Sequence, residues 1–544
     1  MRRLYSRWLA IDVVCVFLAA NLPLDIFLKH SSYNLWAPEI LAIKGMIFLF
    51  AIAVGAVIFV SGAFARVAVF TALAVLTVDI QTDWITTVGL RLGVNVLGFG
   101  LLFWLVRQHL SRVLLTALLL MSVATFFQTG GVQLTREGEP GPQPDDDQSL
   151  PFVLHLILDE QIGVEGIPSE FDPGGEVAAK VREFYLGQSF AVFGRAYSHY
   201  GSTAQSIPNI LNGAASNIVD VFLDRPYERN ILLDQNRWFE MLREKGYRIH
   251  AMESNFMRYV GPPSVRHPQD TSLYYLAATI KPLESAPMTA VEKIPFILST
   301  YYSSSWLLSL AAAEYTDFAL SEANRIFLPQ WDLNGHYPGA LATLEALDVF
   351  TQQMQHAGPG QAYFAHILMP HSPYGYDSDC QMEMQPGRWL RSKVFHLGER
   401  TNDASTRAER YPLYFGQMLC LQSRLGEIFQ ILRDKGLWED AIVVVHGDHG
   451  SRLSEWPPIP SLVGKYSDSD YMDYFSTLFA VKSPVFAPQY EREIVPVDQL
   501  FSRLLQEGAA PKEDQPWVFF QGSDRVMKRY PMPGFGHGRP QSRH

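Results

Sequence analysis

Hydrophobic residues are concentrated in the first quarter of the chain, where five apolar stretches follow one another. They cover residues 8–28, 41–63, 67–85, 92–107 and 113–128. The second stretch is the clearest, because about twenty consecutive and mostly apolar residues are enough to cross a bilayer as a helix. The first contains Asp12 and Pro23 and is followed by no small-residue cleavage site, so it is not a cleavable signal peptide. We therefore predict an N-terminal multi-span membrane domain of about five helices over residues 1–128.

The basic residues around these stretches predict how the helices cross the membrane. Those at the start of the chain and in alternate loops are Arg2, Arg3, Arg7, Arg66, Arg107 and Arg112, and those at the edges of the opposite loops are Lys29 and Arg91. Because Lys and Arg are enriched in cytoplasmic loops, this pattern places the N-terminus in the cytoplasm. An odd number of spans then puts the chain after residue 128 on the outer side of the membrane.

Two exceptions to the pattern leave alternatives open. Asp12 and Asp79 lie within apolar stretches, where they would line a polar path or a proton relay, or form hydrogen bonds at the membrane interface or between helices; we favour the hydrogen bonds. Residues 294–313 are apolar enough for a sixth span, but a sixth span would return the rest of the chain to the cytoplasm. We therefore favour a packed helix or a helix on the membrane surface there.

After the last apolar stretch the pattern changes twice. Residues 129–150 are rich in Gly, Pro and acidic residues, which predicts an extended linker, and their run DDD favours solvated linker over a calcium site. From residue 151, short apolar runs alternate with helical patterns, which is typical of an α/β domain with a largely parallel central sheet. The expected strands are 152–158, 248–252, 362–369 and 441–445, and the expected helices include 237–245 and 411–435. One such domain is predicted over residues 151–544.

The composition excludes some classes of protein. The 34 Phe, 24 Tyr and 11 Trp among 544 residues exclude a mainly disordered chain. The net charge of −11, with no basic tract, argues against a nucleic-acid-binding protein. Of the three cysteines, Cys15 lies in an apolar stretch, so only Cys380 and Cys420 could form a disulfide. Such a pair would indicate an oxidising compartment, and two unrelated thiols are the alternative.

Four segments of the soluble part carry the candidate chemistry. They are LILDEQ with Asp159 and Glu160, SHYGSTAQSIPNILNG with Ser202 and Thr203 before a helix expected near Ser206, HILMPHSPYGYD with His371, and VVVHGDHGSRL with Asp448 and His449. In parallel sheets, ligands bind beyond the carboxyl ends of the strands, which is where these residues are expected. In GDHG, flanking glycines let the backbone turn and present a carboxylate and an imidazole together, which favours a metal site over a polar turn.

Together these residue types predict a divalent cation that activates a hydroxyl nucleophile. The cation would lower the pKa of the hydroxyl and neutralise the oxygens of a phosphoryl or sulfuryl group. Backbone amides at the helix start near Ser206 can hold an anionic oxygen as well.

The same segments carry a family resemblance. LILDE, GSTAQSIPNILNG, MPHSPY and HGDHGSR, in this order, resemble the alkaline phosphatase/sulfatase superfamily. Five spans before an external catalytic domain are similar to its membrane branch, which contains the phosphoethanolamine transferases acting on lipid A and the lipoteichoic acid synthases. The resemblance implies a sulfatase-like, alkaline-phosphatase-type α/β domain behind the membrane helices.

The resemblance also implies a metal-binding set. Asp159 matches the first acidic ligand and Glu160 matches the second acid found in sulfatases, so either could bind the metal, and we favour Asp159. Asp448 and His449 match the closing ligands. Thr203 matches the threonine nucleophile of the transferases, which lies at the metal.

Two residues are implied to bind the substrate. His371 resembles the histidine that contacts substrate or protonates the leaving group. Arg452 could bind an anion, and a surface ion pair is the alternative. True sulfatases need Cys or Ser followed by x-Pro-x-Arg for conversion to formylglycine, whereas Thr203 is followed by AQSI. A sulfatase of that kind is therefore not expected.

The sequence thus predicts a metal-dependent transferase that moves phosphoethanolamine or phosphoglycerol from a phospholipid to lipid A or a cell-envelope glycan. A phosphothreonine at Thr203 would be the intermediate. The alternatives are a membrane-anchored phosphoric or sulfuric ester hydrolase and an inactive sensor or scaffold. One divalent metal ion, zinc or manganese, is the expected cofactor, and the ligand types do not decide between the two. The expected location is a bacterial inner (plasma) membrane, with the catalytic domain facing the periplasm or exterior.

Overall fold

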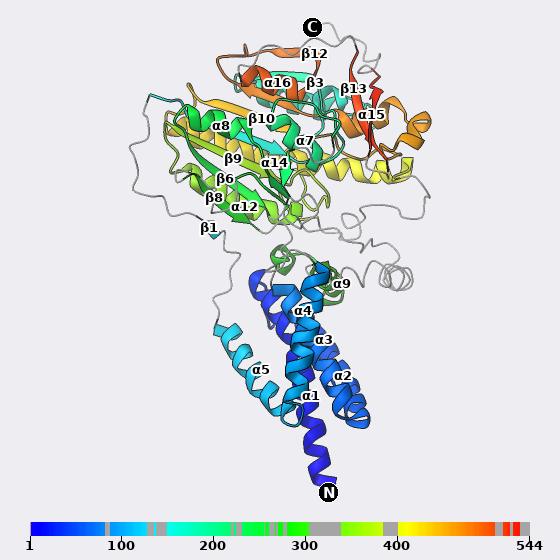
Figure 1. The fold of residues 1–544 in the computed structure, drawn as a ribbon. Coiled ribbons are helices and arrows are strands. Elements are labelled where there is room, and N and C mark those ends of the chain that lie inside the picture. The colour runs from blue at the N-terminus through cyan, green and yellow to red at the C-terminus, as the bar shows by residue number, and fades with distance from the viewer. Residues whose placement is uncertain are drawn as a thin grey trace. The chain divides into compact units, whose positions relative to one another are not determined.

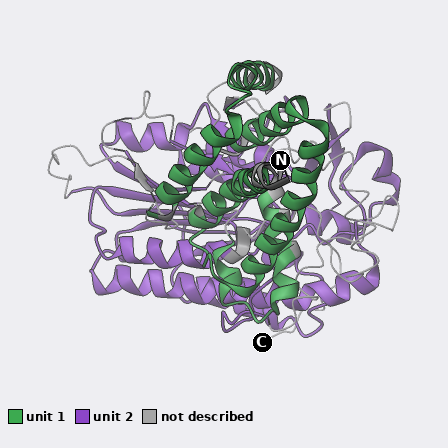
Figure 2. Cartoon of the chain, turned by 90° about the horizontal axis from the view of Figure 1, so that it is seen from below, with its two compact units in different colours: residues 1–133, 279–336 green, residues 134–278, 337–544 purple. Residues whose placement is uncertain are grey.

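The chain folds into two compact units. The computed structural model describes residues 2–81, 88–127, 135–137, 149–218, 222–224, 231–254, 256–260, 267, 270–275, 280–303, 339–383, 401–505, 515–522 and 526–533. Unit 1 comprises Met1–Gln133 and Thr279–His336, and unit 2 comprises Leu134–Ala278 and Tyr337–His544 (Figure 2). The boundary near residue 133 lies close to the predicted one at 128. Residues 279–336, predicted as part of the α/β domain, instead group with the N-terminal helices.

Unit 1 is helical, as the apolar stretches predict. Its helices are α1 (Arg2–His30), α2 (Pro38–Ser61), α3 (Ala63–Gln81), α4 (Val88–Leu105), α5 (Leu110–Phe127) and α9 (Ala290–Ser303), with a 3₁₀ turn at Lys281–Glu284 (Figure 1). Within the described residues, Ala10–Lys29 and Pro38–Ser61 are long and apolar enough to cross a membrane, and α3, α4 and α5 carry shorter apolar stretches.

A buried polar cluster joins three helices of unit 1. Asp12 of α1 is 1% exposed and accepts hydrogen bonds from Arg66 of α3, at 3.1 Å from Nε and 2.9 Å from Nη2. Ser111 of α5 donates its hydroxyl to the same carboxylate. This confirms hydrogen bonding between helices for Asp12, whereas the side chain of Asp79 lies outside the described residues. The cluster places the first half of α1 next to the starts of α3 and α5.

The opposite ends of the helices meet α9. Lys44 near the start of α2 lies 2.8 Å from Asp25 near the end of α1. The ammonium of Lys293 on α9 lies 4.0 Å from Glu39 of α2, and it donates to the carbonyl of Glu284. Residues 290–303 therefore form a packed helix, as we favoured for this apolar stretch, while 304–313 lie outside the described residues.

Unit 2 is built on a nine-stranded sheet that is largely parallel. In spatial order its strands are β1 (Thr135–Glu137), β8 (Thr271–Tyr275), β6 (Arg248–Ser254), β9 (Gln361–Ile367), β2 (Val153–Leu158), β10 (Ile442–Gly447), β11 (Phe479–Lys482), β3 (Ala191–Tyr197) and β12 (Tyr490–Pro496). Only β1 and β11 run antiparallel to their neighbours in this sheet. The four predicted strands are adjacent, as β6, β9, β2 and β10. The short strand β1 lies within the predicted linker.

Helices cover both faces of the sheet, which explains why its central strands are continuously apolar. One face carries α6 (Glu176–Leu186), α12 (Gly339–Met354) and α14 (Ala404–Asp434), and the other carries α7 (Thr203–Leu211), α8 (Arg237–Glu244) and α16 (Val497–Leu504) (Figure 1). Helix α14 begins seven residues before its predicted start because Asp403 caps it by accepting from the amide of Thr406.

The remaining elements of unit 2 are small. They are α15 (Asp468–Phe475), the hairpin β13 (Trp517–Gln521) and β14 (Met527–Pro531), a three-stranded sheet of β4 (Leu223–Asp224), β5 (Ile231–Leu233) and β7 (Met257–Arg258), and 3₁₀ turns at Val164–Gly166 and Pro460–Lys465.

Candidate active site

The candidate residues lie at the carboxyl ends of four strands. Asp159 follows β2, Asp448 and His449 follow β10, His371 follows β9, and Thr203 lies at the start of α7 beyond β3. These four strands run in the same direction, so their carboxyl ends meet at one edge of the sheet. The fold therefore places the four sequence segments together.

Three of these residues form a buried cluster of metal-ligating atoms. Asp159, Asp448 and His449 each offer one atom, and these atoms lie within 4.8 Å of one another. In Asp448, Oδ1 accepts the amides of Glu160 and His449 at 3.0 and 2.9 Å, while Oδ2 has no hydrogen-bond partner among the described residues. Asp159 is similar, because Oδ2 lies 3.3 Å from Nε2 of His366 and Oδ1 has no such partner there. In each carboxylate one oxygen thus has no hydrogen-bond partner among the described residues, and in Asp448 this oxygen, Oδ2, lies 3.2 Å from Nε2 of His449.

The orientation of His449 completes this set. Its Nδ1 lies 3.0 Å from the carbonyl of Gly450, and because a carbonyl only accepts, Nδ1 carries the proton. In the neutral ring Nε2 then presents a lone pair, and it lies 3.3 Å from Oγ1 of Thr203 and 3.2 Å from Oδ2 of Asp448. A backbone carbonyl that fixes the tautomer in this way is the usual arrangement of a metal-ligating histidine.

The electrostatics of the cluster favour a cation. Asp159 and Asp448 are 2% and 0% exposed. Burial and the nearby Asp159 raise the pKa of Asp448, because two carboxylates in a dry site disfavour a second negative charge. Two buried carboxylates, one imidazole and one hydroxyl fit a divalent ion such as zinc or manganese, whose charge would compensate both acids.

Thr203 lies at the very start of its helix. We predicted a start near Ser206, but α7 begins at Thr203, because Ser202 is extended and its carbonyl already accepts the amides of Gln205 and Ser206. Ser206 is fully buried inside the first turn and donates its hydroxyl to the carbonyl of Asp448. This bond ties the helix that carries Thr203 to the loop that carries Asp448.

Glu160 lies outside the cluster and faces the candidate substrate-binding residues. Its carboxylate lies 3.4 Å from Nε2 of His371 and 3.6 Å from Nη1 of Arg452. Glu160 and Arg452 have φ angles of 63° and 57°, a left-handed conformation that costs energy for residues other than glycine. Such strain is concentrated at functional sites, and here it affects two residues that contact each other.

The surroundings of His371 favour its protonated form. Burial acts to lower the pKa of His371, but the carboxylates of Glu160 and Asp159 act in the opposite direction and raise the pKa above its ordinary value. Nδ1 lies 2.5 Å from the carbonyl of Ser372, so this nitrogen also donates. When both nitrogens carry a proton, His371 can give the proton on Nε2 to a substrate oxygen.

Several residues near the site were not predicted. His366 on β9 is fully buried beside Asp159, and a histidine inside an apolar strand is a signal that could have found it. Tyr414 and Gln417 of α14 contact the loops after β2 and β9, and nothing in their local sequence indicates this. Cys380 and Cys420 form a disulfide, which decides between the two alternatives that the sequence left open.

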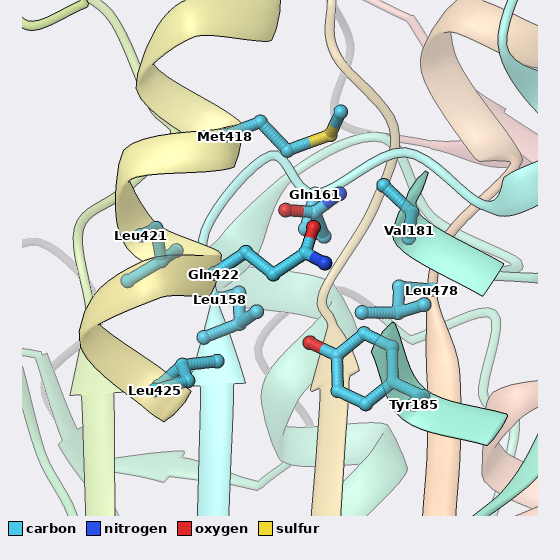
Figure 3. Close-up of a pocket in the computed structure, with 9 residues that line it drawn as sticks. All are labelled: Leu158, Gln161, Val181, Tyr185, Met418, Leu421, Gln422, Leu425 and Leu478. Atoms are coloured by element: carbon cyan, nitrogen blue, oxygen red, sulfur yellow. The ribbon is translucent and has the colours of Figure 1, made fainter. Parts of the chain in front are cut away.

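A separate small pocket lies between α6, α14 and the ends of β2 and β11. Figure 3 shows its nine lining residues, with the amides of Gln161 and Gln422 and the hydroxyl of Tyr185 among apolar side chains. None of the candidate site residues lines it. The candidate chemistry is therefore not located in this pocket.

The family is shown by a profile match. The profile described as Sulfatase matches residues 185–509, more than half of the chain, and this range includes Thr203, His371, Asp448, His449 and Arg452. The chain therefore belongs to the sulfatase family and is an enzyme of the alkaline phosphatase/sulfatase superfamily. No curated protein sequence matches it.

Three solved structures align with the chain at low identity. The C-terminal periplasmic domain of EcEptC from Escherichia coli is 11% identical, with a TM-score of 0.37 over 71% of this chain and 92% of that one. The lipoteichoic acid synthase LtaP from Listeria monocytogenes is 11% identical, with a TM-score of 0.36 over 73% and 89%. The phosphonate monoester hydrolase of Agrobacterium radiobacter is 14% identical, with a TM-score of 0.38 over 68% and 80%.

Proposed function

We propose that this enzyme is a phospho-headgroup transferase that takes phosphoethanolamine or phosphoglycerol from a phospholipid and passes it to lipid A or an envelope glycan. The observation that carries the proposal is the hydroxyl of Thr203, 3.3 Å from Nε2 of His449, beside two buried carboxylates, in each of which one oxygen has no hydrogen-bond partner among the described residues. A bound zinc or manganese ion would lower the pKa of that hydroxyl and neutralise the charge on the phosphoryl oxygens.

The residues of the chain divide the reaction into two steps. Oγ1 of Thr203 attacks the phosphorus and loses its proton to solvent, and the bond from phosphorus to the glycerol oxygen breaks. That oxygen keeps the bonding electrons and takes the proton from Nε2 of His371, so diacylglycerol leaves. In the second step the acceptor hydroxyl attacks the phosphothreonine, gives its proton to His371, and releases Thr203, whose oxygen regains a proton.

Two groups are suited to hold the anionic oxygens during both steps. The guanidinium of Arg452 points to the same carboxylate as His371, and it is about one-third exposed, so it can also reach a substrate. The first amides of α7 carry the positive end of the helix dipole at Thr203 itself. Both groups act on charge that develops around the phosphorus.

An outer location of the catalytic domain is supported by two observations. The first half of α1 and the starts of α3 and α5, which the Asp12 cluster joins, carry the basic residues that favour the cytoplasm, so the end that contacts α9 would face outward. The Cys380–Cys420 disulfide fits an oxidising compartment. A lipid donor and a tethered enzyme would then share one membrane surface.

The test is diacylglycerol release by the full-length protein purified in detergent. Phosphatidylethanolamine and phosphatidylglycerol are supplied separately with zinc or manganese, and Thr203→Val is compared with Thr203→Ser, which keeps a hydroxyl. We expect release from one lipid by the wild type and by Thr203→Ser, and loss of release in Thr203→Val. No release from either lipid by metal-loaded protein would contradict the lipid donor.

The same assay separates transfer from hydrolysis. If the phospho-headgroup appears on an added acceptor such as lipid A, the enzyme is a transferase. If it appears only as the free phosphate ester, water is the acceptor and the hydrolase alternative holds. Protein that binds no stoichiometric metal would instead favour an inactive sensor or scaffold.

A further inference from the structure

The loop that carries His371 lies along one face of helix α14. Gln417 of α14 is fully buried and makes three hydrogen bonds to this loop. Its Oε1 accepts the amide of Gly375 at 3.0 Å, and its Nε2 donates to the carbonyls of Pro370 at 3.1 Å and His371 at 2.9 Å. One side chain therefore fixes the backbone at His371 itself and on both sides of it.

Two neighbouring positions of α14 hold the same loop. A Cβ at Gly416 would lie 3.3 Å from Cα of Asp377, so the absence of a side chain lets the loop approach the helix closely. Cys420, nearly one turn after Gln417, is joined by the disulfide to Cys380 at the far end of the loop. The helix is a firm support, because Leu421 and Leu425 next to these positions are buried to 1% and 0% exposure.

We infer that Gln417 is a positioning residue for His371 and that the Cys380–Cys420 disulfide restrains the same loop. The inference deepens the proposed function, because it rests on His371 as the proton donor to the leaving oxygen. As the bond from phosphorus to that oxygen breaks, the oxygen takes the proton from Nε2 of His371. Proton transfer needs hydrogen-bond distance, and an error of about 1 Å in placement can cost roughly 100-fold in rate.

The variant Gln417→Glu tests this without changing the size of the side chain. One carboxylate oxygen can still accept the amide of Gly375, but the other would face the carbonyls of Pro370 and His371, which cannot donate. The loop would then move away from its present position. The matched control is Gln422→Glu, the same substitution five residues further along α14, where the side chain bonds to Lys180 instead.

The readout is the dependence of rate on the leaving group, measured on full-length, metal-loaded protein. Bis(p-nitrophenyl) phosphate has a good leaving group that needs no proton, whereas diphenyl phosphate and phosphatidylethanolamine have poor ones. We expect Gln417→Glu to lower phenol and diacylglycerol release about 100-fold and to leave nitrophenol release close to that of the wild type. Gln422→Glu should leave all three rates unchanged.

Reduction of the disulfide gives a second test that needs no substitution. The only other cysteine, Cys15, lies in unit 1, so a phosphine reductant acts on one bond of unit 2. In reduced wild-type protein, the rate of phenol release should fall more than the rate of nitrophenol release. If Gln417→Glu does not fold, this comparison alone tests the inference.

Equal effects on all leaving groups, or no effect, in both tests would overturn the inference. A wild type that cleaves the aryl esters but releases no diacylglycerol contradicts the proposed lipid donor instead, and the phenol-to-nitrophenol ratio still tests Gln417.

Discussion

Because Asp159 and Asp448 are buried together, we expect Asp448→Asn to have opposite effects on stability in the metal-free and in the metal-loaded protein. The perturbation is Asp448→Asn. Its side-chain oxygen can keep the amides of Glu160 and His449 now bound by Oδ1, and its amide nitrogen takes the place of Oδ2. The substitution therefore preserves the geometry of the loop, but it removes one negative charge and one metal ligand.

The magnitude follows from the distance between the charges. At an effective dielectric constant of about 20, two unit charges at the 4.8 Å limit of this cluster repel by about 3.5 kcal/mol. Without metal, relief of this repulsion should raise the free energy of unfolding of Asp448→Asn by up to about 3 kcal/mol. With metal the order should reverse, because a ligand at about 1,000 times its Kd stabilises the wild type by about 4.1 kcal/mol, which exceeds the relief of repulsion, and the variant has lost a ligand.

The assay is thermal unfolding followed by tryptophan fluorescence, in a chelator and again with zinc or manganese. The matched control is Asp434→Asn, an exposed aspartate near the end of α14, which should change neither midpoint. An Asp448→Asn protein that is less stable than the wild type in the chelator would refute the argument from repulsion. A midpoint that still rises with metal as it does in the wild type would refute the assignment of Asp448 as a ligand.

Two further predictions concern residues behind the site. The hydroxyl of Tyr414 donates to the carbonyl of Glu160 at 2.6 Å and accepts the amide of Ile162 at 2.9 Å, and Tyr414→Phe removes both bonds. The free energy of unfolding should therefore fall by about 2–4 kcal/mol, seen as a lower midpoint of thermal unfolding. An unchanged midpoint would contradict this. Burial lowers the pKa of His155 far below its usual value. Below about pH 6.5, His155 therefore binds a proton in the unfolded chain but stays neutral in the folded chain. The free energy of unfolding then falls as the pH falls. His155→Leu should make this pH dependence shallower, whereas the exposed His356→Leu should not; equal slopes would refute the argument.

Much of the fold around the site could be predicted because the relevant signals are local. The strands β2, β6, β9 and β10 are buried on both faces, so each appears in the sequence as a continuous apolar run. Since parallel strands end at the same edge of a sheet, the polar residues that follow these runs could be predicted to lie at that edge. The spacing of glycines around Asp448 and His449 gave the turn, and the structure groups these two with Asp159 rather than with Glu160.

Other features depend on contacts between distant parts of the chain and could not be predicted. The strand β11 lies between β10 and β3 and pairs antiparallel with both. β3 is distant from β11 in the chain, so the local sequence of β11 does not indicate this position. Gln417 resembles any polar residue on a long helix until the loop after β9 is packed against it. Within residues 279–336 the apolar run 294–313 predicted a helix but not the unit that it joins, and these residues group with the N-terminal helices.

The central claim is that Thr203 carries the phospho-headgroup between donor and acceptor. The most direct measurement is mass spectrometry of the peptide that contains Thr203, after metal-loaded protein is incubated with phosphatidylethanolamine or phosphatidylglycerol without acceptor and then quenched with acid. The account predicts an added phosphoethanolamine or phosphoglycerol on Thr203, absent in Thr203→Val and removed when an acceptor is added. Release of diacylglycerol with no modified Thr203, or with the headgroup on another residue, would contradict it.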